Sequence, residues 1–222
     1  MVVIVQQFPI PEGKTGQQVV DMLIKQFEAM AFNRIGNFVV DCETYYSSPT
    51  ITPPRVLNII HNSDFPASCF AQLDTGTCLR ADSYFDAMMM VLNGIYQAKR
   101  GTKIESKGPK FQKGDFVVKI GSVSIGPSFR GILIEIEYGP CSVPLYCWDL
   151  LKEFMKSFMK VPKEPPPYLK AKMGEICTPT DIISQYNIHF TNLRKATPIA
   201  SCPPPLTVKG SSNEVQNNGD MA

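Results

Sequence analysis

The chain has 222 residues, of which 22 are Lys or Arg and 20 are Asp or Glu, and its formal net charge is +2. Charged residues make up 19% of the chain and apolar residues 44%, whereas an average domain has roughly 25% charged residues. This composition can form a full core and excludes a wholly disordered chain, a collagen and a coiled coil. The balanced charge, without a long Lys/Arg run, also argues against a nonspecific nucleic-acid-binding domain.

The sequence predicts a soluble intracellular protein with reduced thiols. No apolar stretch reaches the roughly 18 residues of a transmembrane helix, and the segment Met1–Phe8 lacks the basic start of a secretory signal. The 7 cysteines are odd in number and include no Cys-x-x-Cys pair, which argues against a disulfide scaffold or a zinc ribbon. We therefore expect cysteines that pack as small apolar side chains.

The first part of the chain alternates between strand and helix patterns. Val2–Phe8 is short and rich in β-branched residues, which predicts a strand. Thr15–Ala31 has helical periodicity, and Thr15 with Gln18 forms a capping-box pattern. Four more strands are predicted at Asn37–Tyr46, Arg55–His61, Ser68–Leu73 and Thr77–Ala81, with a hairpin loop at 74–76 between the last two.

A second helix is predicted over Ser83–Ala98, with Ser83 and Asp86 in capping positions. Its wide apolar face is rich in Met and consists of Phe85, Met88, Met89, Leu92, Ile95 and Tyr96. Such a face is typical of a core or of a promiscuous binding groove, and we favour core packing.

Three more strands and a third helix follow. The strands are predicted at Lys103–Gln112, Asp115–Ile125 and Arg130–Tyr138, and a change of apolar phase at Gly121-Ser122 indicates a β-bulge. The helix is predicted at Leu145–Lys160. Its apolar stripe is typical of packing on the protein's own sheet or of contact with a partner, and we favour packing on the sheet. The stripe consists of Trp148, Leu151, Phe154, Met155 and Phe158.

Composition changes near residue 161, because nine of the 19 prolines lie in the last 62 residues. We predict a barrel-like α+β core over 1–160, a Pro-rich connector over 161–177, a C-terminal helix packing on the core over 178–196 and a disordered tail over 197–222. Thr178, Pro179 and Asp181 are typical of the start of that helix. The fold class is α+β, an antiparallel barrel-like sheet of about eight strands with flanking helices; a two-layer open sheet is the alternative.

The residues that carry chemistry form no convincing catalytic set. His61 and His189 have no Cys or carboxylate partner at the spacing of a metal site or a catalytic triad, so we expect structural or surface histidines. The glycines of 121–126 lie in or just after a strand and do not precede a helix, which excludes a dinucleotide-binding loop.

Paired carboxylates are the one enzymatic hint. Asp41 and Glu43 share a face of one strand, and Glu135 and Glu137 share a face of another. If both pairs faced inward across a small barrel they could hold a divalent cation, as in tunnel-type metal-dependent phosphohydrolases. Only Lys119 and Arg130 are then available for phosphates in the two adjacent strands, and solvent-facing carboxylates explain the same alternation. We expect no catalytic, cofactor-binding or metal-binding residue, and the phosphohydrolase stays as the alternative.

A set of segments together resembles the animal Mediator of RNA polymerase II transcription subunit 20 family. The resemblance runs from about residue 5 to 160, and more loosely to Lys195, and its specificity lies in the whole set rather than in a catalytic signature. The segments are Val39–Tyr45, His61–Phe70, Cys78–Asp82, Lys103–Glu105, Phe116–Gly121 and Glu137–Cys141.

The resemblance implies a non-catalytic transcription coregulator in the head module of Mediator, located in the nucleus. It implies a barrel that forms a heterodimer with Mediator subunit 18, a tethering helix from subunit 8, and links to the TATA-binding protein and the RNA polymerase II initiation machinery. It implies no cofactor, no membrane and no direct sequence-specific contact with nucleic acid. The connector and the tail depart from the family pattern. A nucleic-acid-binding module, with affinity that falls steeply with salt, is a third hypothesis.

Overall fold

The computed structural model describes residues 1–49, 53–99, 101–160 and 164–196. The start of the predicted connector (161–163) and the whole predicted tail (197–222) lie outside the described residues. The elements in chain order are β1 (Val2–Phe8), α1 (Gly16–Ala29), β2 (Asn33–Ser47), β3 (Val56–Asn62), β4 (Ser68–Leu73), β5 (Cys78–Asp82), α2 (Phe85–Val91), the 3-10 helix η1 (Leu92–Gly94), β6 (Tyr96–Ala98), β7 (Ile104–Lys113), β8 (Phe116–Ile125), β9 (Ser128–Tyr138), α3 (Pro144–Lys156), α4 (Pro167–Lys170) and α5 (Pro179–Lys195).

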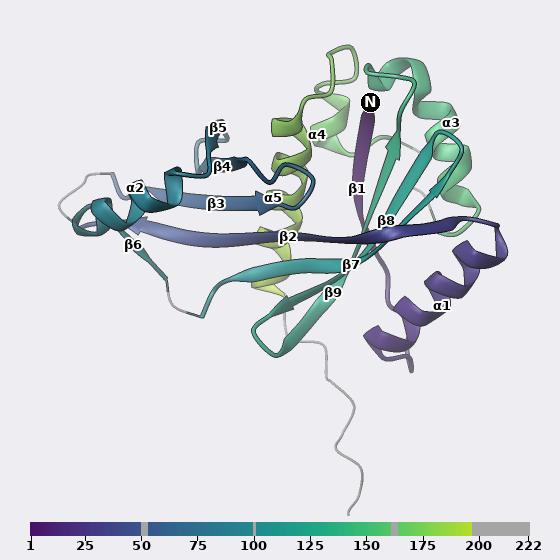
Figure 1. Cartoon of the computed structure of the whole chain (residues 1–222), viewed down its shortest axis with the longest axis horizontal. Coiled ribbons are helices and arrows are strands. Elements are labelled where there is room, and N and C mark those ends of the chain that lie inside the picture. Colours follow the sequence, from purple (N-terminus) through teal and green to yellow (C-terminus); the bar gives the residue numbers. More distant parts are fainter. Residues whose placement is uncertain (50–52, 100, 161–163, 197–222) are drawn as a thin grey trace, which may run out of the picture.

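One curled antiparallel sheet forms the centre of the molecule (Figure 1). The strand order is β1-β9-β8-β7-β2-β3-β4-β5, and the short β6 pairs with the end of β2. Among the described strands no ladder joins β1 to β5, so the sheet is a half-barrel that is open between these two edges. The predicted α+β class and barrel-like antiparallel sheet with flanking helices are confirmed.

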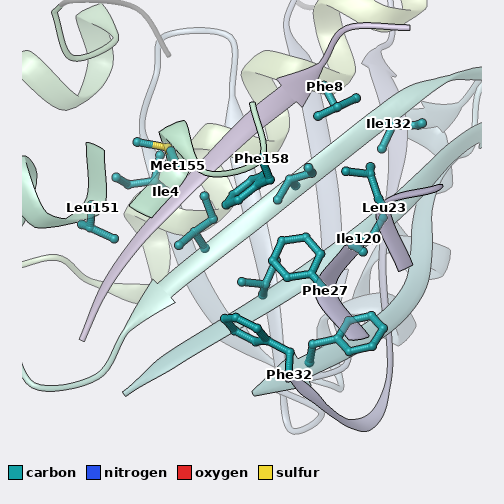
Figure 2. Packing of buried hydrophobic residues seen from close by; sticks show 14 of the residues in the cluster. Ile4, Phe8, Leu23, Phe27, Phe32, Ile120, Ile132, Leu151, Met155 and Phe158 are labelled. Carbon is teal, nitrogen blue, oxygen red and sulfur yellow. The ribbon is translucent and has the colours of Figure 1, made fainter. Parts of the chain in front are cut away.

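Helices α1 and α3 cover one face of the sheet, and Phe27 of α1 lies at the centre of the core between them (Figure 2). Its ring centroid lies 5.2 Å from that of Phe32, 5.0 Å from that of Phe158 and 6.1 Å from that of Phe111. These aromatic contacts connect α1 to β7 and to the residues that follow α3. The predicted stripe of α3 packs in this core, which confirms the interpretation that it faces the protein's own sheet.

Helix α5 packs on the opposite face of the sheet and contacts β1 and β9 as well as β4 and β5. Its start is fixed by the predicted capping box, in which Asp181 accepts a hydrogen bond from the backbone of Thr178 at 2.8 Å. The five residues of its predicted apolar face are all buried: Ile182, Ile183, Tyr186, Phe190 and Leu193. Because α5 contacts strands near both edges, it lies in the hollow of the half-barrel.

Side chains from α4 and α5 satisfy the free edge of β1, which pairs only with β9 among the described strands. Gln185 accepts a hydrogen bond from the Val5 backbone N–H at 2.8 Å and donates one to the Val3 carbonyl at 3.0 Å. The Tyr168 hydroxyl and His189 Nε2 both donate to the Val5 carbonyl, at 2.9 and 3.0 Å. These side chains replace a neighbouring strand, so this edge is closed to an added strand.

The predicted helix over Ser83–Ala98 is wrong in its second half. The helix α2 ends at Val91, and after the 3-10 turn the residues Tyr96–Ala98 form β6 against β2. Asn93 and Gly94 are poor helix formers, and pairing with β2 outweighs the helical pattern. The N-cap of α2 is Tyr84, without a side-chain cap hydrogen bond, so the predicted caps do not form.

Core packing of the predicted Met-rich face is only partly confirmed. Met89 is buried, and Phe85, Leu92 and Tyr96 are partly buried against the same small cluster. Met88 and Ile95 are each 44% exposed, which places them at the surface.

The predicted bulge at Gly121-Ser122 is displaced. The register between β8 and β9 shifts between Val123 and Ser124, and the extra residue, Arg130, lies in β9. Glycine is needed at position 121 for packing, because a Cβ there would lie 2.1 Å from the Ser106 hydroxyl oxygen of the neighbouring strand.

None of the helices in the described residues has the length and apolar character of a membrane-spanning helix.

We predict that Gln185→Ala lowers the free energy of unfolding by about 2–4 kcal/mol, because it leaves the buried Val5 N–H and Val3 C=O without partners. Urea unfolding followed by the fluorescence of Trp148, the single tryptophan, measures the change. Gln17→Ala on the exposed face of α1 is the matched control and should change stability by less than about 0.5 kcal/mol. Equal effects of the two variants would contradict the role of Gln185.

Candidate functional site

The structure separates the two carboxylate pairs. Asp41 and Glu43 alternate along β2 with Val40 and Cys42, which pack against the α5 side of the sheet, so the two carboxylates face away from α5. They form ion pairs with Lys103 at 3.2 and 3.3 Å. Glu135 lies on the α5 side, where it contacts Tyr186. The pairs lie on opposite faces of the sheet, so the idea that they converge on one cation is wrong.

A buried ion network occupies the hollow of the half-barrel beneath α5. Lys119 of β8 and Glu135 of β9 are direct cross-strand partners, and both side chains are only 2% exposed. The Lys119 ammonium donates to Glu135 Oε1 at 2.6 Å and also to Asp64, which follows β3. The Tyr186 hydroxyl of α5 donates to Glu135 Oε2 at 2.6 Å, and Lys110 of β7 pairs with Asp64 at 3.2 Å.

The pKa shifts of Lys119 and Asp64 favour the charged forms of both groups. Burial opposes the charged form of Lys119, but the carboxylates of Glu135 and Asp64 outweigh it and raise the pKa of Lys119. Burial likewise opposes ionisation of Asp64, and the hydrogen bond from Lys119 outweighs it and lowers the pKa of Asp64. The pKa of the Tyr186 hydroxyl is raised far above its usual range, by burial first and then by Glu135, so it remains a donor.

This arrangement stabilises the fold and does not present a reactive group. Both oxygens of Glu135 accept short hydrogen bonds from the protein itself, and Asp64 pairs with the ammonium groups of Lys119 and Lys110. A phosphohydrolase tunnel needs a surplus of cationic side chains and room for a metal ion and a phosphate. Here the side chain of Tyr186 lies in the hollow, and Arg130 donates to the Ala196 carbonyl at the end of α5 rather than facing Glu135.

His61 is a half-exposed surface histidine, and it has two carboxylate partners that its spacing in the sequence does not reveal. Its Nδ1 lies 3.2 Å from Asp41 Oδ1, across the ladder from β2, and its Nε2 lies 3.0 Å from Asp86 Oδ2 of α2. Residues 41, 61 and 86 are too far apart in sequence for a spacing motif, and the sheet brings them together. The side chain of His189 contacts the Val5 backbone, so it has a structural role.

Among the described residues, a groove and two apolar faces are candidate binding surfaces. A groove of about 660 Å³ runs along the outer side of α5, between the β4–β5 hairpin loop and residues 168–177. One apolar face combines β5 with α2, and the other covers the start of α3. The sequence pattern missed both faces, because the exposed residues of α2, like those of α3, lie outside the predicted apolar stripes.

We predict that Glu135→Gln lowers the free energy of unfolding by about 3 kcal/mol, because it leaves the Lys119 ammonium buried beside a neutral partner. The double variant Lys119→Met, Glu135→Gln should recover most of that loss, since it buries neither charge. Glu153→Gln, in an exposed pair with Lys156, is the control and should cost less than about 1 kcal/mol. A double variant as unstable as Glu135→Gln would show that the network is not a buried ion pair.

Acid should destabilise the protein in part through Asp64. The folded pKa of Asp64 is lowered from 3.8, so its contribution is present above that pH and is lost as the pH falls through the folded pKa. The difference in stability between the parent protein and Asp64→Asn should therefore be constant near neutral pH and shrink below about pH 4. Urea unfolding at several pH values measures it, and a difference that stays constant into acid would contradict the assignment.

Comparison with known proteins identifies the family. The family model described as TATA-binding related factor (TRF) of subunit 20 of Mediator complex matches residues 1–191. The chain is 45% identical over 203 residues to Mediator of RNA polymerase II transcription subunit 20 of Anopheles gambiae, covering 85% of this chain and 93% of that protein. It is 40% identical over 197 residues to the Homo sapiens protein of the same name, covering 86% and 93%.

Among solved structures, the Schizosaccharomyces pombe Mediator head module contains a chain with a TM-score of 0.34 and 11% identity, covering 71% of this chain and 95% of that chain. That likeness is weak, and the assignment depends on the sequence relatives, which extend the resemblance through most of α5. The relatives are transcription coregulators rather than enzymes, in agreement with a hollow filled by its own ion network. The chain therefore belongs to the Mediator subunit 20 family and is a non-catalytic Mediator subunit.

Proposed function

We propose that this chain acts in the head module of Mediator, in the nucleus, as a heterodimer with Mediator subunit 18. A helix of subunit 8 tethers the pair, and the pair links regulators to the TATA-binding protein and the RNA polymerase II initiation machinery. Family membership supports the assembly, and the apolar face of β5 and α2 is the observation that carries the pairing.

That face combines a free strand edge with large exposed side chains. Among the described strands β5 pairs only with β4, so its other edge has backbone groups available for a partner. Tyr84, Met90 and Val91 are 80%, 79% and 84% exposed, and Leu79 of β5 is 55% exposed. Apolar side chains clustered beside an open edge favour burial in a protein interface. We assign this face to subunit 18.

The groove along α5 supports a place for the tethering helix. Leu73, Ile176 and Ile188 line it, and the charged side chains of Lys172 and Glu175 lie among them. An amphipathic helix has this combination of an apolar stripe and charged flanks, and helix-in-groove binding is a common mode of recognition.

The test is purification of the tagged chain from nuclear extract at moderate salt, with companions identified by mass spectrometry. We expect subunit 18 in equal amount together with other head subunits. The triple variant Tyr84→Ser, Met90→Ser, Val91→Ser should recover at least about tenfold less subunit 18, because it removes apolar anchors of the kind that dominate interfaces.

The matched control is Leu145→Ser, Tyr146→Ser, Leu150→Ser, which alters similarly exposed side chains at the start of α3. It should retain subunit 18. Circular dichroism should show that both triple variants are folded. Loss of subunit 18 in the control alone would contradict the assigned face. Recovery of the parent chain without any Mediator subunit would contradict the assembly itself.

A further inference from the structure

The outer face of the sheet carries a cluster with mixed ligand chemistry, away from the buried network and from the groove. Asp41 of β2, His61 of β3 and Cys69 of β4 are successive cross-strand partners and form one row across three strands. The short helix α2 places Asp86 beside this row. The ligand atoms of His61, Cys69 and Asp86 all lie within 4.8 Å of one another.

We infer that His61, Cys69 and Asp86 form a binding site for Zn²⁺. The three side chains offer one nitrogen, one sulfur and one oxygen atom, and zinc accepts each of these donors. Zinc–ligand bonds of about 2.0–2.3 Å place tetrahedral ligands about 3–4 Å apart, so the observed cluster needs only small side-chain rotations to enclose the ion. Water would fill the fourth position.

Asp41 is placed to orient the histidine ligand. In the tautomer that leaves Nε2 free for a metal, Nδ1–H donates to Asp41 Oδ1, and the observed separation is 3.2 Å. Lys103 pairs with the other oxygen of Asp41 at 3.2 Å and fixes the carboxylate in turn. A carboxylate behind a metal-bound imidazole is the usual second layer of a protein zinc site. This contact is independent of the three ligands and agrees with the same ion position.

The exposure of the three side chains also agrees with a site that an ion enters from one side. The Cys69 side chain is buried in the small cluster with Ile59 and Met89, so the sheet side is closed to water. The side chains of His61 and Asp86 are 39% and 48% exposed, which leaves an entry for the ion from solvent. A bound ion would add a connection between α2 and strands β3 and β4, beside the packing of Met89 and the hydrogen bond between His61 and Asp86.

Metal binding is tested on the full-length chain without a polyhistidine tag, after treatment with a chelator and its removal. Titration with Zn²⁺ in a calorimeter should give one ion per chain, and Co²⁺ should show the absorption of a thiolate-bound tetrahedral ion. Zn²⁺ should also raise the thermal unfolding midpoint, because it binds the folded state.

Cys69→Ser and Asp86→Asn should each weaken Zn²⁺ binding about tenfold or more, and Asp41→Asn should weaken it to a smaller extent. The matched controls are Cys78→Ser and Asp82→Asn, in the neighbouring strand β5, and both should bind like the parent chain. Asp86 is half-exposed, so Asp86→Asn tests the site even if Cys69→Ser does not fold. Absence of stoichiometric binding, or binding unchanged in Asp86→Asn, would overturn the proposal and leave the cluster as a plain ion pair.

Discussion

The contact between helix α5 and the hollow of the sheet is the interaction on which the rest of the structure depends. An open antiparallel sheet has two edges with unpaired backbone groups, and its apolar faces must be covered. Gln185 hydrogen-bonds the free edge of β1, while the apolar residues of α5 cover the inner face between β1 and β5. The half-barrel is therefore closed by a helix from the end of the fold, far from β1 in sequence.

The same helix decides what the hollow can do. Tyr186 donates a hydrogen bond to Glu135, and Glu135 accepts one from Lys119, so these polar groups of the hollow already have partners within the protein. A catalytic pocket would keep such groups available to a substrate. In a Mediator subunit 20 family member the same set of groups serves to specify one packing of helix on sheet, because any displaced member would leave a charge buried without its partner.

The surfaces available for binding other molecules therefore lie on the outside of the half-barrel. The core faces of α1, α3 and α5 are occupied by the chain's own sheet, which leaves β5, α2, the start of α3 and the outer side of α5 for other molecules. The helix α2 is short, and few of its side chains are buried, so ties to the sheet through His61 and Asp86 matter for the orientation of its exposed apolar residues. The proposed zinc site and the proposed partner face thus share one element, although each is tested by itself.

The sequence by itself determined the local elements and the family. Alternation in β2, the capping boxes of α1 and α5 and the apolar stripes of α3 and α5 are set by neighbours in the chain, and the structure confirms them. The solvent-facing position expected for Glu135 in β9 is wrong, because its side chain is buried in the hollow. Only the tertiary structure decided that Asp41 and Glu135 face opposite sides, that Tyr96–Ala98 pairs as a strand, and that Asp86 reaches His61. These outcomes depend on strand register and on the curl of the sheet, which bring together residues whose separation in sequence carries no signal.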